Sequence, residues 1–297
     1  MRFASPRQVT LIGVGLIGGS IGLALKQLPD PPKVIGLGRR QSSLDAALAR
    51  GAVDQVSTSL TEAIAGSDLI VVCTPVNRII EYIKEISKIQ LPADCLISDA
   101  GSTKQAIVDA AEMYLSDPGI FVAAHPLAGS EKSGVDHAQV DLFKNSRCLI
   151  TPSERNNAQQ LSKVQDFWKS IGCKVLNMSP ERHDRLLALT SHLPHLLAPA
   201  LINLASVSGH EEDELIEIFA GSFKDMTRVA GSDPDMWLDI FFTNKENILG
   251  TIDKYELMLD QLKNALKNDD TELLKETLSA ARTRRNRIYH APKKLDR

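Results

Sequence analysis

A glycine-rich turn near the start of the chain constrains its fold more than any other feature. Residues 13–18 read Gly-Val-Gly-Leu-Ile-Gly and directly follow an apolar run. Between a strand and a helix, the first glycine allows a tight turn, the second lets the backbone approach a pyrophosphate, and the third lets the helix pack on the strand. The first N–H groups of the helix receive the negative charge. The turn therefore predicts a dinucleotide site formed by Gly13, Gly15, Leu16, Ile17 and Gly18.

The residues after the second apolar run, 34–37, indicate which dinucleotide binds. A site for NAD usually has an acidic residue there, which binds the ribose hydroxyls of the adenosine. This chain has Gly38 at that place, followed by Arg39 and Arg40. Because guanidinium groups pair with phosphate and a carboxylate would repel it, we predict NADP in preference to NAD.

Short apolar runs recur along the first half of the chain, separated by segments long enough for a helix. They lie at residues 9–13, 34–37, 69–73, 96–98, 121–124, 148–150 and 174–176. Runs without polar alternation, joined by helical crossovers, are typical of a parallel sheet with helices on both faces. Thr74 and Pro75 follow one run, where a loop would pass the nicotinamide half of the cofactor. We therefore predict an α/β dinucleotide-binding domain over residues 1–178.

The second half of the chain, residues 179–297, has helical spacing and no convincing strand. We predict an all-α domain there, with breaks at Pro194, 208–209 and 231–234. One long helix is predicted from about residue 236 to 266. A single small domain seldom supports a helix of that length, so we expect it to pack across the interface of a homodimer.

The composition excludes several classes of protein. The 297 residues include 34 Lys+Arg and 37 Asp+Glu, so the net charge of -3 does not favour a nucleic-acid partner. No uninterrupted apolar run reaches the ~18 residues of a membrane span. The N-terminus lacks the apolar core of a secretory signal. We expect a cytoplasmic protein without a membrane partner.

The best candidate for a catalytic residue is His125, which is followed by Pro126 and lies at the end of the run 121–124. Ligands of open α/β sheets bind at that edge, where a histidine can act as a general base. The preceding run ends in Asp-Ala-Gly-Ser-Thr-Lys, which brings Ser102 to the same edge. In the helical half the candidates are His192, His195 and Arg228. The two histidines lack a nearby third ligand and the cysteines lack metal-ligand spacing, so no metal is predicted.

Six short motifs span most of the chain. They are Gly-Val-Gly-Leu-Ile-Gly-Gly-Ser (13–20), Cys-Thr-Pro-Val (73–76), Asp-Ala-Gly-Ser-Thr-Lys (99–104), His-Pro-Leu-Ala-Gly-Ser-Glu-Lys-Ser-Gly (125–134), Thr-Ser-His-Leu-Pro-His (190–195) and Phe-Lys-Asp-Met-Thr-Arg (223–228). In this order they resemble the prephenate and arogenate dehydrogenase family of tyrosine biosynthesis. The resemblance implies a Rossmann-like N-terminal domain, a helical C-terminal domain that pairs two subunits, and an active site between the domains.

The resemblance also implies a reaction, the oxidative decarboxylation of prephenate to 4-hydroxyphenylpyruvate. His125 would take the proton of the ring hydroxyl while hydride leaves the same carbon for the nicotinamide. Ser102 would form hydrogen bonds near that hydroxyl and His125. Arg228 would pair with a substrate carboxylate, and His192 and His195 would line the substrate side.

Other functions remain open at this point. A second histidine at His195 suits a keto-acid side chain better than an ammonium group, which favours prephenate over arogenate as substrate. Other two-domain NADP-dependent reductases share the glycine turn and the helical half, but they typically use a lysine of the helical domain. A non-catalytic NADP-sensing module would leave His125, Ser102 and Arg228 without a purpose.

Overall fold

A five-stranded parallel sheet forms the centre of the first half of the chain. The computed structural model describes residues 6–130, 132–207, 217–218 and 220–290. The strand order is β3-β2-β1-β4-β5. The strands are β1 (Gln8–Ile12), β2 (Lys33–Leu37), β3 (Gln55–Ser57), β4 (Leu69–Val72) and β5 (Leu96–Asp99). Ile12 pairs with both Leu37 and Val72, and Val72 pairs with Asp99, so four carboxyl ends meet at one edge.

Three further strands continue beside β5 in a different pattern. They are β6 (Ala123–Pro126), β7 (Arg147–Thr151) and β8 (Lys174–Asn177), and a bridge between Ile97 and Phe121 connects them to β5. β7 runs antiparallel to β6 and parallel to β8. The prediction of one parallel sheet over all the runs was therefore wrong at β7 and β8. In the described part of the connection from β6 to β7, the 3₁₀ turn η2 (Val135–His137) is the only helical element, and without a helical crossover the next strand turns back antiparallel.

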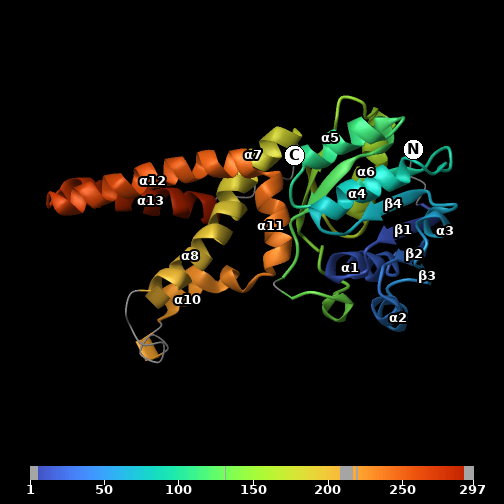
Figure 1. The fold of residues 1–297 in the computed structure, drawn as a ribbon, viewed down its shortest axis with the longest axis horizontal. Helices are drawn as coiled ribbons and strands as arrows, with labels where there is room; N and C mark the ends of the chain where they lie inside the picture. Colours follow the sequence, from blue (N-terminus) through green and yellow to red (C-terminus); the bar gives the residue numbers. More distant parts are fainter. Residues whose placement is uncertain (1–5, 131, 208–216, 219, 291–297) are drawn as a thin grey trace. The chain divides into compact units, whose positions relative to one another are not determined.

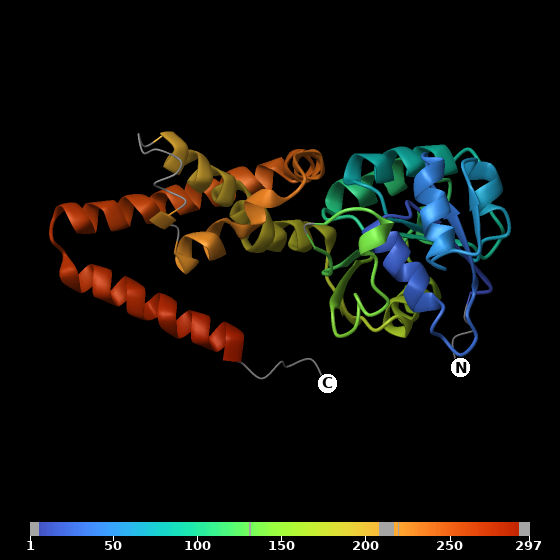
Figure 2. The same cartoon turned by 90° about the horizontal axis from the view of Figure 1, so that it is seen from below.

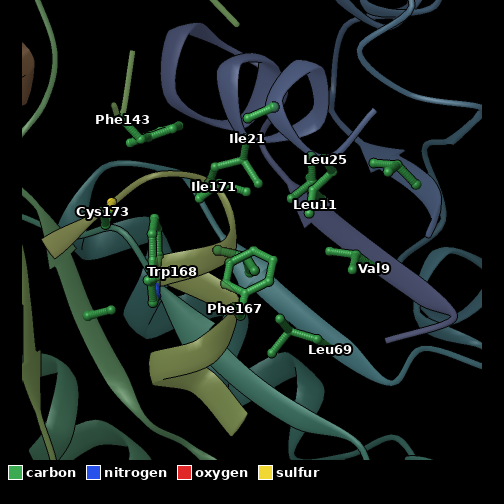
Figure 3. Packing of buried hydrophobic residues seen from close by; sticks show 14 of the residues in the cluster. Val9, Leu11, Ile21, Leu25, Leu69, Phe143, Phe167, Trp168, Ile171 and Cys173 are labelled. Atoms are coloured by element: carbon green, nitrogen blue, oxygen red, sulfur yellow. The ribbon is translucent and has the colours of Figure 1, made fainter. Parts of the chain in front are cut away.

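Six helices cover the two faces of the sheet (Figure 1). They are α1 (Leu16–Leu25), α2 (Gln41–Ala49), α3 (Leu60–Ile64), α4 (Val76–Ile86), α5 (Gln105–Tyr114) and α6 (Ala158–Ser170). Buried side chains of α1, α2 and α6 share one core, and those of α3, α4 and α5 share the other. Figure 3 shows Phe167 and Trp168 of α6 in the same core as Ile21 and Leu25 of α1.

Polar side chains fix where several helices begin. Asn157 accepts hydrogen bonds from two backbone N–H groups of α6 and forms a capping box with Gln160. Ser59 caps α3 and Ser179 caps α7 in the same way. These short polar side chains satisfy N–H groups that have no partner within a helix.

The second half of the chain is helical, as predicted. Its elements in the described residues are α7 (Pro180–Leu187), the π-helical turn η3 (Ala188–His192), α8 (Leu193–Val207), α10 (Gly221–Thr227), the 3₁₀ turn η4 (Arg228–Gly231), α11 (Pro234–Thr243), α12 (Lys245–Lys267) and α13 (Thr271–His290). The break at 231–234 is confirmed, and the break at 208–209 lies outside the described residues.

Two predictions about these helices were wrong. Pro194 does not break the chain's helical course, because η3 joins α7 and α8 into a stretch of 28 residues, Pro180–Val207. The predicted long helix ends early at Asn244, whose backbone (φ -123, ψ 26) leaves the helical region, and α12 begins after it. By length and composition alone the stretch Pro180–Val207 is apolar enough to cross a membrane. A core helix passes the same test, and this one carries buried His183, Asp184 and His192.

The chain divides into two compact units, Met1–Ile248 and Leu249–Arg297. The second unit holds α13 and all but the first turn of α12, and these two helices are joined by a short turn and run in opposing directions (Figure 2). Both helices expose large apolar side chains, among them Leu257, Met258 and Leu259 of α12 and Leu278 and Ile288 of α13. The domain boundary at residue 178 stays a prediction.

Candidate active site

The glycine turn has the shape of a phosphate cradle. Gly13 has a φ of +95, and a Cβ there would lie 2.8 Å from the carbonyl oxygen of Cys73. A Cβ on Gly18 would lie 2.0 Å from the carbonyl oxygen of Gly13, so the turn and α1 pack too closely for a side chain. A Cβ on Gly15, in contrast, would meet no heavy atom of the described chain within 4 Å. The backbone at Gly15 is thus open to a ligand.

The surroundings of this cradle also fit a dinucleotide. Gly15 is the N-cap residue of α1, whose first turn (Leu16, Ile17) carries no acidic residue and no side-chain cap among the described residues. Its N–H groups can therefore receive a pyrophosphate. Thr74, beside Gly13, holds its hydroxyl buried without a hydrogen-bond partner in the described part of the chain. Such an orphan polar atom at the Thr74-Pro75 turn is what a bound polar ligand would satisfy.

The two arginines lie at the same edge of the sheet. The N–H of Gly13 donates to the carbonyl of Leu37 at 2.8 Å, which ties the glycine turn to the end of β2. Gly38 follows and is half-buried, whereas Arg39 and Arg40 are exposed. Arg40 also begins α2 as its N-cap residue. Both guanidinium groups thus lie near the end of β2, beside the glycine turn.

His125 lies within β6 and begins a chain of hydrogen bonds. Its Nδ1 is 2.9 Å from Nε2 of His183, whose Nδ1 is 2.7 Å from Oδ1 of Asp184. The carboxylate of Asp184 also accepts hydrogen bonds from the backbone N–H groups of Lys104 (2.8 Å) and Gln105 (2.9 Å). The first turn of α5 thus holds Asp184, Asp184 holds His183, and His183 holds His125.

The hydrogen bonds from His125 through His183 to Asp184 determine where the imidazole hydrogens lie. An ionised carboxylate only accepts, so His183 donates from Nδ1 and is left with Nε2 as an acceptor. His125 must then donate from Nδ1, which leaves its own Nε2 with a free lone pair. Burial lowers the pKa of His125 well below its usual value of 6.5, and the charge of Lys104 acts in the same direction. His125 is therefore neutral near pH 7 and can accept a proton at Nε2.

A buried ion pair holds the backbone next to His125. Lys104 and Asp99 are both fully buried and form a salt bridge. The ammonium group of Lys104 also donates to the carbonyl of Ala124 at 2.8 Å, and Asp99 accepts from the N–H of Ala124 at 2.9 Å. Both backbone groups of the residue before His125 are thus fixed. Ser102 lies on the turn between Asp99 and Lys104 and is half-buried. The described structure gives its hydroxyl no hydrogen bond to His125.

Two histidines of the helical half lie on Trp237 of α11. The ring of His195 stacks on the indole at 3.6 Å between centroids, and His192 meets it edge-on at 6.1 Å. Burial lowers the pKa of His192 to about 4, and burial together with the charge of Arg228 lowers the pKa of His195. Arg228, at the end of α10, is exposed. A proton on His192 would lower the pKa of His125, so His192 belongs to the same electrostatic cluster as His125 and His183.

The chain matches known proteins along most of its length. Residues 21–177 match the family model described as "Prephenate dehydrogenase, nucleotide-binding domain", and residues 179–280 match "Prephenate dehydrogenase, dimerization domain". The chain belongs to the prephenate dehydrogenase family. It is 34% identical to the prephenate dehydrogenase of Bacillus subtilis over 90% of this chain and 72% of that protein. It is 35% identical to the cyclohexadienyl dehydrogenase of Zymomonas mobilis over 91% of this chain and 92% of that one.

A solved member of the prephenate dehydrogenase family has the same fold. The crystal structure of prephenate dehydrogenase from Aquifex aeolicus, in complex with hydroxyphenyl propionate and NAD+, superimposes with a TM-score of 0.90. The two chains are 34% identical, and the match covers 96% of this chain and 99% of the other. The prediction of a nucleotide-binding α/β domain followed by a helical domain is thus confirmed.

Four residues of the site were missed from the sequence. His183 and Asp184 complete the hydrogen-bond chain of His125, Trp237 carries two histidine rings, and Asn244 contacts His192. A signal for the first two was available, because His183, Asp184 and Leu187 fall on one face of the predicted helix. Titratable side chains are seldom buried on an apolar helix face unless they have a role. A histidine and an aspartate on such a face therefore indicate a functional site more strongly than an exposed pair would.

Proposed function

We propose that this chain oxidatively decarboxylates prephenate to 4-hydroxyphenylpyruvate, with NADP as the preferred hydride acceptor. The observation that carries the proposal is the geometry of His125, whose Nδ1 is 2.9 Å from His183 Nε2 and whose Nε2 has no hydrogen-bond partner among the described residues. A base of this kind at the carboxyl edge of a dinucleotide-binding sheet suits the removal of a proton from an alcohol. A nicotinamide nucleotide, when bound, supplies the hydride acceptor.

His125, His183 and Asp184 have separate roles in the proposed reaction. His125 accepts the proton of the ring hydroxyl at Nε2, and the hydride leaves the same ring carbon. The C–C bond to the ring carboxylate then breaks, carbon dioxide departs, and its bonding electrons complete the aromatic ring as a phenolate, whose oxygen takes the proton back from His125 to give the phenol. The positive charge that develops on His125 is shared through His183 toward the carboxylate of Asp184, 2.7 Å from the second ring.

Binding a dianionic substrate requires cationic groups and donors. Arg228 is the cation near His195, and we assign to it one substrate carboxylate. His192 and His195 line the same side, and Ser102 lies on the turn between β5 and α5. Arg39 and Arg40 support the choice of NADP, since both are exposed beside the predicted place of the 2′-phosphate. The relative from Aquifex aeolicus was crystallised with NAD+, so NAD is the necessary comparison.

We further propose that the enzyme is a cytoplasmic homodimer. The match to a dimerization domain covers residues 179–280, and α12 and α13 expose apolar side chains such as Leu257, Leu266 and Leu278. Contiguous exposed apolar side chains on paired helices are typical of an interface with a second copy.

The geometry of His195 does not support the prediction that this residue favours prephenate, and it favours a second substrate, arogenate. His195 is 2.8 Å from the carbonyl oxygen of Ser191 through Nδ1, so this nitrogen carries the hydrogen. The neutral ring then offers Nε2 as an acceptor, which suits the ammonium group of arogenate rather than the keto group of prephenate.

The test is the appearance of reduced nicotinamide absorbance with prephenate or arogenate, each with NAD or NADP. Turnover in any combination supports the reaction, and the four kcat/KM values assign substrate and cofactor together. The variant His125→Asn should bind NADP normally and lose nearly all turnover. Silence of the wild type in all four assays, with NADP still binding, would exclude the proposed reaction.

A further inference from the structure

Asn244 lies at the corner between α11 and α12 and is almost completely buried, at 3% exposure. Its Nδ2 is 2.8 Å from the carbonyl oxygen of Asp184 and 3.0 Å from Nδ1 of His192. Its Oδ1 accepts a hydrogen bond from the side chain of Asn247 at 2.8 Å. One amide group therefore joins α7, η3 and the start of α12 beside the histidine cluster.

The orientation of this amide follows from its partners. The carbonyl oxygen of Asp184 can only accept, so the group that faces it must be the NH₂ of Asn244 and not the oxygen. An NH₂ group has two hydrogens. One points to Asp184, and the other is available for Nδ1 of His192, which must then accept it.

We infer that Asn244 is a positioning residue that sets the tautomer of His192, so that Nε2 carries the hydrogen and His192 acts as a hydrogen-bond donor toward an anionic substrate. The tautomer follows from the chain's own contacts. The donor role rests on the function proposed above, because it takes the oxygens of a prephenate-like dianion as the acceptor.

The site thus gives opposite tautomers to two neighbouring histidines. A histidine and a carboxylate behind His125 place its hydrogen on Nδ1 and leave Nε2 as a base. An amide behind His192 places the hydrogen on Nε2 and leaves this ring as a donor. An aspartate in place of Asn244 would accept from Nδ1–H and reverse the second assignment.

The neutral state of His192 agrees with this assignment. A protonated ring would carry a hydrogen on Nδ1, which would face the NH₂ of Asn244 without an acceptor. The groups around His192 are His183 and Asp184 on α7, His195 on α8, Asn244 and Trp237 from α11 and its end, and His125 on β6. Only Asp184 among them favours a charged ring, and burial outweighs it.

The first experiment reads the tautomer directly in the wild-type chain. Long-range ¹H–¹⁵N correlation spectra of protein labelled in its histidines distinguish a protonated ring nitrogen from an unprotonated one. The signal of His192 among the seven histidines is assigned by its loss in His192→Gln. At pH 7.5 we expect hydrogen on Nε2 and none on Nδ1. A hydrogen on Nδ1 would overturn the inference, and this result needs neither substrate nor a variant of Asn244.

The second experiment exchanges the amide for a carboxylate. In Asn244→Asp we expect the hydrogen of His192 on Nδ1 and, at pH 9 where the ring is neutral, a rise of about tenfold or more in KM for prephenate with a smaller change in kcat. KM for NADP should stay within about twofold. The matched control is Asn264→Asp, the same change at an exposed position of α12, which should leave all three quantities unchanged.

The outcomes separate this inference from the proposed function. An Asn244→Asp variant with His192 still protonated only on Nε2, or with an unchanged KM for prephenate, would contradict the assigned role. If the wild type does not turn over prephenate at all, the proposed function fails while the spectra still decide the tautomer.

Discussion

The buried pair of Lys104 and Asp99 leads to a quantitative prediction. In Lys104→Met a side chain of similar length replaces the lysine, and the carboxylate of Asp99 stays buried without its counter-charge. Breaking a buried ion pair by removing one partner typically costs about 3–5 kcal/mol. Asp99 keeps two backbone donors, Gly101 N–H at 2.8 Å and Ala124 N–H at 2.9 Å, so we expect the lower end of that range, about 3 kcal/mol.

The assay is thermal unfolding followed by circular dichroism at pH 7.5 and one fixed protein concentration. For a chain of this size, about 3 kcal/mol corresponds to a decrease in Tm of roughly 6–12 °C. The double variant with Asp99→Asn should be more stable than Lys104→Met alone, because no unpaired charge remains. Since Lys104 also holds the carbonyl of Ala124, next to His125, the single variant should lose kcat as well.

The control is Lys169→Met, which removes the exposed partner of Asp166. Exposed pairs contribute only about 0–1 kcal/mol, so its Tm should change by no more than a few degrees. The reasoning is refuted if Lys104→Met unfolds within about 2 °C of the wild type, or if the double variant is less stable than the single one.

Three further predictions concern the ligands and pH. Replacing Arg39 and Arg40 by alanine should weaken NADP by about tenfold or more and NAD by much less, measured by fluorescence titration; an equal loss for both would exclude contact with the 2′-phosphate. Arg228→Ala should raise KM for prephenate by at least about tenfold, and an unchanged KM would place the carboxylate elsewhere. Because the pKa of His192 is about 4 in the folded chain against 6.5, the unfolded chain binds a proton first as pH falls below 6.5. Stability should therefore decrease from pH 6.5 toward 4, by up to about 3 kcal/mol from this group, and His192→Gln should reduce that decrease in urea titrations. A wild-type stability that does not change over this range would contradict the assignment.

The dinucleotide side of the site was accessible from the sequence because its determinants are local. The glycine turn, the end of β2 and the Thr74-Pro75 turn each lie within a few residues of a strand end. A parallel sheet with strands in register brings such ends together whatever the rest of the chain does. For the same reason His125 was placed at the correct edge.

The support of His125 was not accessible, because it depends on contacts distant in the sequence. His125 meets a histidine 58 residues away, and Asp184 binds a backbone group 80 residues away. No local pattern determines which helix faces which strand. The reversal of β7 was missed for another reason, since a strand buried on both faces has the same apolar pattern in either direction.

The helix break at Asn244 was also missed from the sequence because it depends on contacts distant in the chain. Residues 236–266 have good helical spacing throughout, and asparagine is only a weak helix breaker. The turn there follows from what the amide side chain binds, namely Asp184 and His192. Tertiary contacts therefore decided an element boundary that local preference left open.

The π-helical turn η3 has a consequence for how this helical stretch tolerates changes in length. Its defining hydrogen bond runs from Leu193 N–H to the carbonyl of Ala188, one residue farther back than in an α-helix. In an ideal α-helix His183 and His192, nine positions apart, would point in directions about 180° apart at about 100° per residue. The wide turn takes up one extra residue and brings the two directions to within about 80°. Deleting a single residue of η3 before His192 would make the stretch a regular α-helix with the two histidines eight positions apart, again about 80°, so we expect everything beyond it, His195 included, to keep its direction toward His125.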